Sequence, residues 1–187
     1  MTDDVIIDHR LQSANWVPSP NFDARPDESD ISLIVMHCIS LPPAEYGNGY
    51  VEQFFQNQLD CTLDPYFERL VNLKVSSHLF IDREGGVTQF VDFNQRAWHA
   101  GVSEYKGKPD CNDYSIGIEL EGTDDSSFED AQYESLLGVL KMLIHKYPQL
   151  SSRAIVGHST VAPGRKTDPG SEFEWSKVMR DLRSERL

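Results

Sequence analysis

The apolar run at residues 31–40, ISLIVMHCIS, constrains the fold of this chain more than any other stretch. It is rich in β-branched residues, follows a segment of Pro, Asp and Ser, and is followed by Pro42 and Pro43. A short apolar run that is bounded on both sides by turn-forming residues is typical of a strand buried at the centre of a sheet. Because this strand ends in polar residues, His37 is expected near its carboxyl end.

Further strand patterns follow along the chain. Alternation around Ile116, Ile118 and Leu120 predicts a strand at 114–122, in which Glu119 and Glu121 share one face. Two β-rich runs joined by glycines predict a hairpin at 75–93, and a short apolar run predicts a last strand at 154–158.

Helical spacing appears at 50–59, at 128–147 and at 173–183, and residues 63–73 are expected to extend the first helix less regularly. The stripe expected to bury the long helix is Leu136, Leu137, Leu140, Leu143 and Ile144. Strands that alternate with helices but include a hairpin predict an α/β (mixed α+β) fold. Its central sheet would be mixed parallel and antiparallel, with helices on its faces.

The chain of 187 residues is long enough for one domain with a real core. We therefore expect a single catalytic domain over 1–187, in which residues 1–30 are largely irregular because they are rich in turn-forming residues and lack a period.

Charge and cysteine content limit the partners. The net charge of −13 argues against nucleic acid, which binds through Lys and Arg, and no basic amphipathic face is present for a membrane. The opening segment, MTDDVIIDHRLQ, is acidic and its apolar stretch is too short for an export signal. The whole chain has three cysteines, and none of them lies in a CxxC spacing, which suits a reducing compartment. A cytoplasmic location is expected.

Two histidines occupy positions suited to chemistry. His37 and His158 each end an apolar β-like run and begin a loop, and the loop after His158 contains Asp168 between restrictive prolines and glycines. Two imidazoles and one carboxylate form the ligand set of a catalytic zinc site. The alternative is that each histidine is a hydrogen-bonded core residue, and spacing alone does not decide between the two.

Five strings, in order, carry a resemblance: VPSPNFDARP, VMHCISLPP, RAWHAG, CNDYSIGIELEG and GHSTVAPGRKTDPG. They resemble the N-acetylmuramoyl-L-alanine amidase family, which includes cytoplasmic anhydro-muramyl-peptide amidases, phage amidase-type lysozymes and peptidoglycan recognition proteins. The similarity extends from about residue 16 to about residue 175. It implies the family's fold and a zinc (Zn²⁺) amidase that cleaves small muropeptides.

Individual roles follow from the same resemblance. It places the zinc ligands at His37, His158 and Asp168, a catalytic glutamate at Glu119 and a catalytic lysine at Lys166. Each of these residues could also have an ordinary structural role. Glu119 could be a solvated carboxylate on a strand, on the same face as Glu121, and Lys166 could be a surface lysine in a loop. Asp168 could instead cap the turn before Pro169.

The resemblance also implies substrate contacts. It places Tyr66 and Trp98 in the pocket walls, and Lys74 and Arg165 where they could meet carboxylates of the substrate. His78 and His99 are expected to be supporting or structural. Two positions depart from the pattern: Cys38 stands where Asn is usual, and Asp110 where Arg often precedes CND.

Three rival hypotheses remain open. The chain could be an amidase of the intact cell wall or a muropeptide-binding module without catalysis. It could also bind another metal or cleave a different amide, since the mixed nitrogen and oxygen ligands do not exclude cobalt or manganese. The expected partner is a small muropeptide, bound by a monomer.

Overall fold

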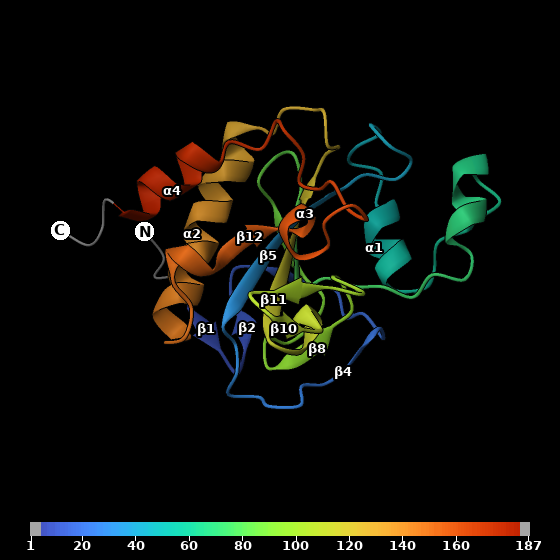
Figure 1. Ribbon diagram of the computed structural model, residues 1–187. Coiled ribbons are helices and arrows are strands. Elements are labelled where there is room, and N and C mark those ends of the chain that lie inside the picture. Colours follow the sequence, from blue (N-terminus) through green and yellow to red (C-terminus); the bar gives the residue numbers. More distant parts are fainter. Residues whose placement is uncertain (1–4, 184–187) are drawn as a thin grey trace.

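A six-stranded mixed sheet forms the centre of the computed structural model, which describes residues 5–183 (Figure 1). The first four residues of the opening segment discussed above lie outside this range. In spatial order the strands are β12 (Ile155–Gly157), β5 (Leu33–Ile39), β11 (Ser115–Glu121), β6 (Leu79–Ile81), β7 (Val87–Gln89) and β3 (Asn15–Trp16). The four strands from β12 to β6 are parallel, whereas β6 and β7 form the expected antiparallel hairpin. The predicted mixed sheet is confirmed.

Strands β5 and β11 lie beside each other at the middle of the sheet. All seven residues of β11 are buried, as expected for a parallel strand covered on both faces. The register pairs Glu119 with His37, and on the other side of β5 it pairs Gly157 with Met36. The carboxyl ends of three neighbouring strands therefore meet at one edge of the sheet.

One face of the sheet is covered by two long helices, α2 (Asp130–Lys146) and α4 (Trp175–Arg183) (Figure 1). The buried face of α2 includes Leu136, Leu140 and Leu143 as predicted, but also Val139. Leu137 and Ile144, expected in the stripe, are only partly buried. Three of the five predicted residues are therefore confirmed, and the buried face also includes Val139, which lies one turn from Leu136.

The opposite face carries a smaller aromatic cluster. Phe80 of β6 points to this side, where it joins Phe54 and Phe55 of α1 (Tyr50–Phe55) and Phe67 of the 3₁₀ helix η1 (Pro65–Leu70). The predicted helix at 50–59 ends early, and residues 63–73 do not extend it. The side chain of Asp64 accepts a hydrogen bond from Tyr66 N at 2.7 Å and starts η1 separately.

Short elements complete the described chain. They are β1 (Ile6–Ile7), β2 (Arg10–Leu11), β4 (Phe22–Ala24), β8 (Gln95–Ala97), β9 (Glu104–Tyr105), β10 (Lys108–Pro109), η2 (Cys111–Asp113), η3 (Ser152–Ala154) and α3 (His158–Val161). The N-terminal stretch, expected to be largely irregular, thus contains four short strands, and β3 joins the main sheet. Strands of two or three residues are too short for alternation to reveal.

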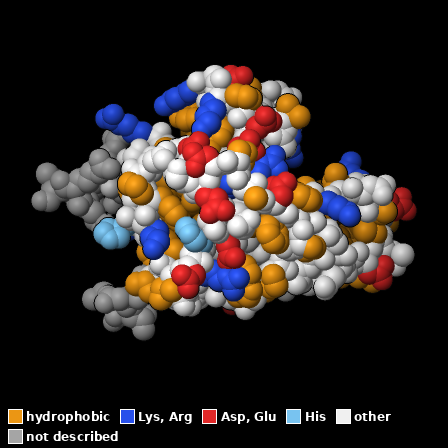
Figure 2. All heavy atoms as spheres, turned by 90° about the horizontal axis from the view of Figure 1, so that it is seen from below, with side chains coloured by type: hydrophobic (Ala, Val, Ile, Leu, Met, Phe, Trp, Pro, Cys, Tyr) orange, Lys and Arg blue, Asp and Glu red, His pale blue; other side chains and the backbone are white. Residues whose placement is uncertain are grey.

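The outer surface shows no concentration of positive charge on the face drawn in Figure 2, where Lys and Arg side chains are scattered among Asp and Glu. Over residues 5–183, no helix combines the length and the apolar character needed to cross a membrane.

Candidate active site

The two histidines singled out by the sequence meet at the carboxyl edge of the sheet. His37 lies in β5, and His158 follows the neighbouring strand β12 directly as the first residue of α3. The Nδ1 atoms of the two rings are 3.0 Å apart, and both side chains are buried. The loop expected after His158 therefore begins with one helical turn, which fixes this histidine on regular structure.

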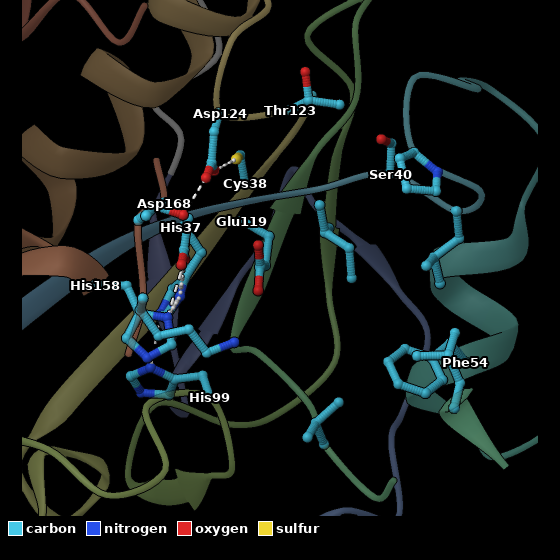
Figure 3. A pocket seen from close by; sticks show the side chains of 18 of the residues that line it. His37, Cys38, Ser40, Phe54, His99, Glu119, Thr123, Asp124, His158 and Asp168 are labelled. Atoms are coloured by element: carbon cyan, nitrogen blue, oxygen red, sulfur yellow. Dashed lines mark hydrogen bonds and ion pairs between the residues drawn. The ribbon is translucent and has the colours of Figure 1, made fainter. Parts of the chain in front are cut away.

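Asp168 completes the group. The loop folds back onto the start of α3, where Ser159 N donates to Asp168 O at 3.0 Å. The Oδ2 atom of Asp168 then lies 3.0 Å from Nδ1 of His37 and 3.0 Å from Nδ1 of His158. The ligand atoms of these three residues all lie within 4.8 Å of one another, and Figure 3 shows the side chains gathered on one side of the pocket.

The electrostatics of this group suit a cation. Burial lowers the pKa of His37 to about 4, so its ring is neutral at pH 7. In the neutral form of His158, Nε2 donates to Ala100 O at 3.0 Å and Nδ1 carries the lone pair that a metal could bind. A carboxylate and neutral imidazole nitrogens at such separations could hold a metal ion.

Glu119 faces the same space from β11 (Figure 3). Its Oε2 atom is buried and has no hydrogen-bond partner. Burial raises its pKa well above the usual value, the charge of Asp168 adds to this, and Lys166 opposes it. A buried carboxyl group with a raised pKa is suited to accept and then donate a proton.

Glu121, which shares the parity of Glu119, has a different environment. Its carboxylate accepts hydrogen bonds from Gly47 N at 2.6 Å and from Arg83 N at 3.2 Å. It is not among the residues that line the pocket. Glu121 therefore ties the loop after β5 to the β6–β7 hairpin, and only Glu119 is free for chemistry.

The loop that carries Asp168 is held from the other side by Asp124. The thiol of Cys38 donates to Asp124 Oδ1 at 3.3 Å, and the hydroxyl of Thr167 donates to Oδ2. Burial, followed by the charges of Glu119 and Asp124 and the hydrogen bond to Asp124, raises the pKa of Cys38, so its thiol stays protonated. The departure at Cys38 thus keeps a hydrogen-bond donor. Asp124 was not identified from the sequence, since no local pattern marks it.

The site opens into a cavity of about 560 Å³. Lys166, Tyr66 and Arg165 line it together with the residues above, whereas Trp98 and Lys74 are not among its lining residues. The Nη2 atom of Arg165 donates to Ala100 O at 2.6 Å and to Val102 O at 2.7 Å. Arg165 also borders a second hollow of about 410 Å³, which Asp110 lines.

His99 lies beside His37 rather than in the outer wall. Its Nδ1 is 3.0 Å from His37 Nε2, and its Nε2 is 3.1 Å from Ser115 Oγ. The sequence suggested a supporting role for His99. It gave no signal for Ser115 or Asn112, although both occur in the CNDYS string.

Comparison with known proteins agrees with this geometry. A family model for N-acetylmuramoyl-L-alanine amidases matches residues 27–171. The 1,6-anhydro-N-acetylmuramyl-L-alanine amidase AmpD of Haemophilus influenzae is 47% identical over 173 residues, which are 92% of this chain and 94% of that protein.

Solved structures extend the similarity to the fold. A crystal structure of an AmpD derivative superposes with a TM-score of 0.92 at 47% identity, covering 95% of this chain and 98% of the other. The Escherichia coli amidase AmiD, in complex with the substrate anhydro-N-acetylmuramic acid-L-Ala-D-γ-Glu-L-Lys, gives a TM-score of 0.60 at 28% identity. That match covers 85% of this chain and 60% of AmiD. The protein described here belongs to the N-acetylmuramoyl-L-alanine amidase family.

Proposed function

We propose that the protein is a zinc-dependent amidase of small muropeptides. It hydrolyses the amide between the lactyl group of (1,6-anhydro-)N-acetylmuramic acid and L-alanine, as part of cell-wall recycling. One observation carries the proposal: two imidazole Nδ1 atoms and one carboxylate oxygen lie 3.0 Å from one another, in a cavity that Glu119 also lines and where its Oε2 atom has no hydrogen-bond partner.

His37, His158 and Asp168 would hold the metal. Two nitrogens and one oxygen suit zinc and leave a fourth position for water or a substrate carbonyl. When bound, zinc supplies a Lewis acid that activates water and polarises the carbonyl group.

Glu119 and Lys166 would supply the remaining chemistry. Glu119, paired with His37 in the sheet register, takes a proton from the attacking water and delivers it to the alanine nitrogen as the amide breaks. This transfer overcomes the poor leaving ability of an amine. Lys166, which lines the same cavity, stabilises the negative charge that develops on the carbonyl oxygen.

Substrate contacts belong to the same proposal. Tyr66 forms part of the cavity wall, and Arg165 has nitrogens other than Nη2 with which to meet a carboxylate. Trp98 and Lys74 each neighbour a lining residue, His99 and Leu73 respectively, and would contact substrate parts that extend past the cavity.

A soluble muropeptide in the cytoplasm is the proposed substrate, rather than the intact wall. The support is the high identity to AmpD over nearly the whole of both chains, together with three cysteines that form no disulfide. The protein is proposed to act as a monomer, and light scattering would measure its oligomeric state.

The deciding experiment compares turnover of a soluble anhydro-muropeptide with turnover of insoluble cell wall by protein of measured metal content. We expect zinc near one equivalent and a clear preference for the soluble compound. Preference for the polymer would reverse the choice of substrate. Zinc-loaded protein that binds the muropeptide but releases no peptide would identify a binding module instead.

A further inference from the structure

A line of hydrogen bonds runs from the backbone into the metal-binding group. Ser115 Oγ donates to Cys111 O at 2.5 Å, Ser115 Oγ is 3.1 Å from His99 Nε2, and His99 Nδ1 is 3.0 Å from His37 Nε2. Four residues are thus connected in series, and the last of them is a metal ligand of the proposed site.

The carbonyl at the start of the line sets the direction of every bond. A carbonyl only accepts, so the single hydroxyl proton of Ser115 is used on Cys111 O. His99 Nε2 must therefore donate to Ser115, which leaves His99 Nδ1 without a proton in the neutral ring. His99 Nδ1 then accepts from His37 Nε2, and His37 Nδ1 is left as a lone pair toward Asp168.

The same short segment orients the second histidine. Ala100, which follows His99, accepts a hydrogen bond from His158 Nε2 through its carbonyl oxygen at 3.0 Å. Asn112 fixes the segment, since its Oδ1 accepts from His99 N at 3.1 Å and from Ala100 N at 2.8 Å. The adjacent residues His99 and Ala100 therefore bind the Nε2 atoms of His37 and His158, respectively.

The position of the His99 ring is also fixed by close packing. A Cβ atom placed on Gly117 of β11 would lie 2.5 Å from His99 Cγ, so the ring occupies the space that a side chain would fill. A ring held by packing and by two hydrogen bonds has little freedom to turn, which makes it suited to orient a neighbouring group.

We propose that His99 is a positioning residue, which holds His37 with its proton on Nε2 and so presents Nδ1 to the metal. Ala100 has the corresponding role for His158. The inference rests on the proposed function, because it assumes that the metal binds between the two Nδ1 atoms. It assigns the RAWHAG string to metal-site geometry, beyond the pocket-wall role expected of Trp98.

Two substitutions at one position test the proposal. His99→Leu removes the acceptor and replaces the imidazole with an apolar side chain of similar bulk, whereas His99→Asn keeps an acceptor close to the position of Nδ1. Loss of an outer hydrogen-bond partner lowers metal affinity by about 10- to 100-fold in other zinc sites. We expect a loss of that size for His99→Leu and a loss below about threefold for His99→Asn, by competition with a chromophoric zinc chelator.

Nuclear magnetic resonance gives a readout that a general packing defect would not reproduce. In the zinc-loaded wild type, the Nε2 proton of His37 should exchange slowly with water and show a coupling to His99 Nδ1. The coupling should vanish in both variants, and the slow exchange should vanish only in His99→Leu. Ser115→Ala removes the hydroxyl group that sets the His99 tautomer. If His99→Leu fails to fold, this variant takes its place, and we expect it to bind zinc more weakly than the wild type.

Equal zinc affinities for His99→Leu and His99→Asn would overturn the proposal, whether both match the wild type or both are weak. Wild-type protein that binds no zinc would overturn it together with the proposed function. Wild-type protein that binds zinc tightly, with His99→Leu and Ser115→Ala unchanged, would overturn this inference alone.

Discussion

The cavity has two walls that are built differently. On the metal side, His37, Glu119 and His158 are 1%, 8% and 3% exposed and lie on or next to the central strands. On the other side is an arm, residues 57–75, which stands away from α2 and α4 in Figure 1. The arm packs through Phe67, but Leu63, Val71 and Leu73 on it are 57%, 60% and 50% exposed.

This difference predicts a division of labour. The metal wall is fixed by the strand ladder and by hydrogen bonds that continue behind the ligands, as precise chemistry requires. The arm presents apolar surface from a segment with one short helix and can vary without disturbing the ligands. Changes in the metal wall should affect metal affinity and kcat, whereas changes in the arm should affect KM.

The strongest test of the metal wall is Asp168→Asn, which keeps the shape of the side chain but removes its charge. We expect zinc to be lost, and turnover to fall by more than about 1,000-fold because metal stabilisation of several kcal/mol disappears. Elemental analysis and a muropeptide assay measure the two effects. The matched control is Asp23→Asn, a carboxylate that pairs with Arg96 and does not line the cavity. Zinc retained by Asp168→Asn would exclude Asp168 as a required ligand.

A second test separates proton transfer from metal binding. Glu119→Gln should keep its zinc, and kcat should fall by about 10²- to 10⁴-fold because the proton carrier is gone. Glu121→Gln is the control on the same strand, since its carboxylate bonds to Gly47 N and Arg83 N outside the pocket. Near-normal turnover of Glu119→Gln would remove Glu119 from this role.

The sequence predicted the metal wall better than the arm, for a physical reason. Apolar runs such as 31–40 report buried strands directly, so the place of His37 at a carboxyl end was correct. The arrival of His158 beside His37 depends on which strand pairs with β5, and periodicity does not encode that choice. The family resemblance predicted both histidines as ligands, and in the structure their Nδ1 atoms are 3.0 Å apart.

The remaining errors have local causes. The residues of the arm follow no helical period, because η1 is a 3₁₀ helix that begins at Pro65, so an extended α1 was wrong. The roles of Ser115, Asn112 and Asp124 arise from contacts between distant segments, which no local pattern reveals.

The buried carboxyl group of Glu119 should make the metal wall unstable without metal. Burial, and then the charge of Asp168, raises its pKa well above the usual value of 4.5, so the fold favours the neutral form. Stability from this group is present below pH 4.5 and is lost as the pH rises through the raised pKa. Above that pKa, folding carries the penalty of a buried charge.

Metal-free Glu119→Gln should therefore have a higher Tm than metal-free wild type at pH 7, and the same Tm below pH 4.5. We expect a rise of several degrees, because 1 kcal/mol shifts the Tm of a chain of this size by about 2–4 °C. Asp168 titrates in both proteins, so the difference between their melting curves isolates Glu119. A difference that persists in acid would point to a packing effect instead.

The arm provides the smallest expected effect and the sharpest contrast. Leu73 and Leu63 are both half exposed, at 50% and 57%, but only Leu73 lines the cavity. If substrate covers about 40 Å² of Leu73, its contribution is about 1 kcal/mol at roughly 25 cal/mol per Å². Leu73→Ser should then raise KM about fivefold with kcat unchanged, the pattern of a contact equally strong in ground and transition states. Leu63→Ser should change neither constant, because its side chain lies on the arm outside the cavity. A fall in kcat for Leu73→Ser would mean that the arm also positions the reacting amide, and the division between the two walls would be lost.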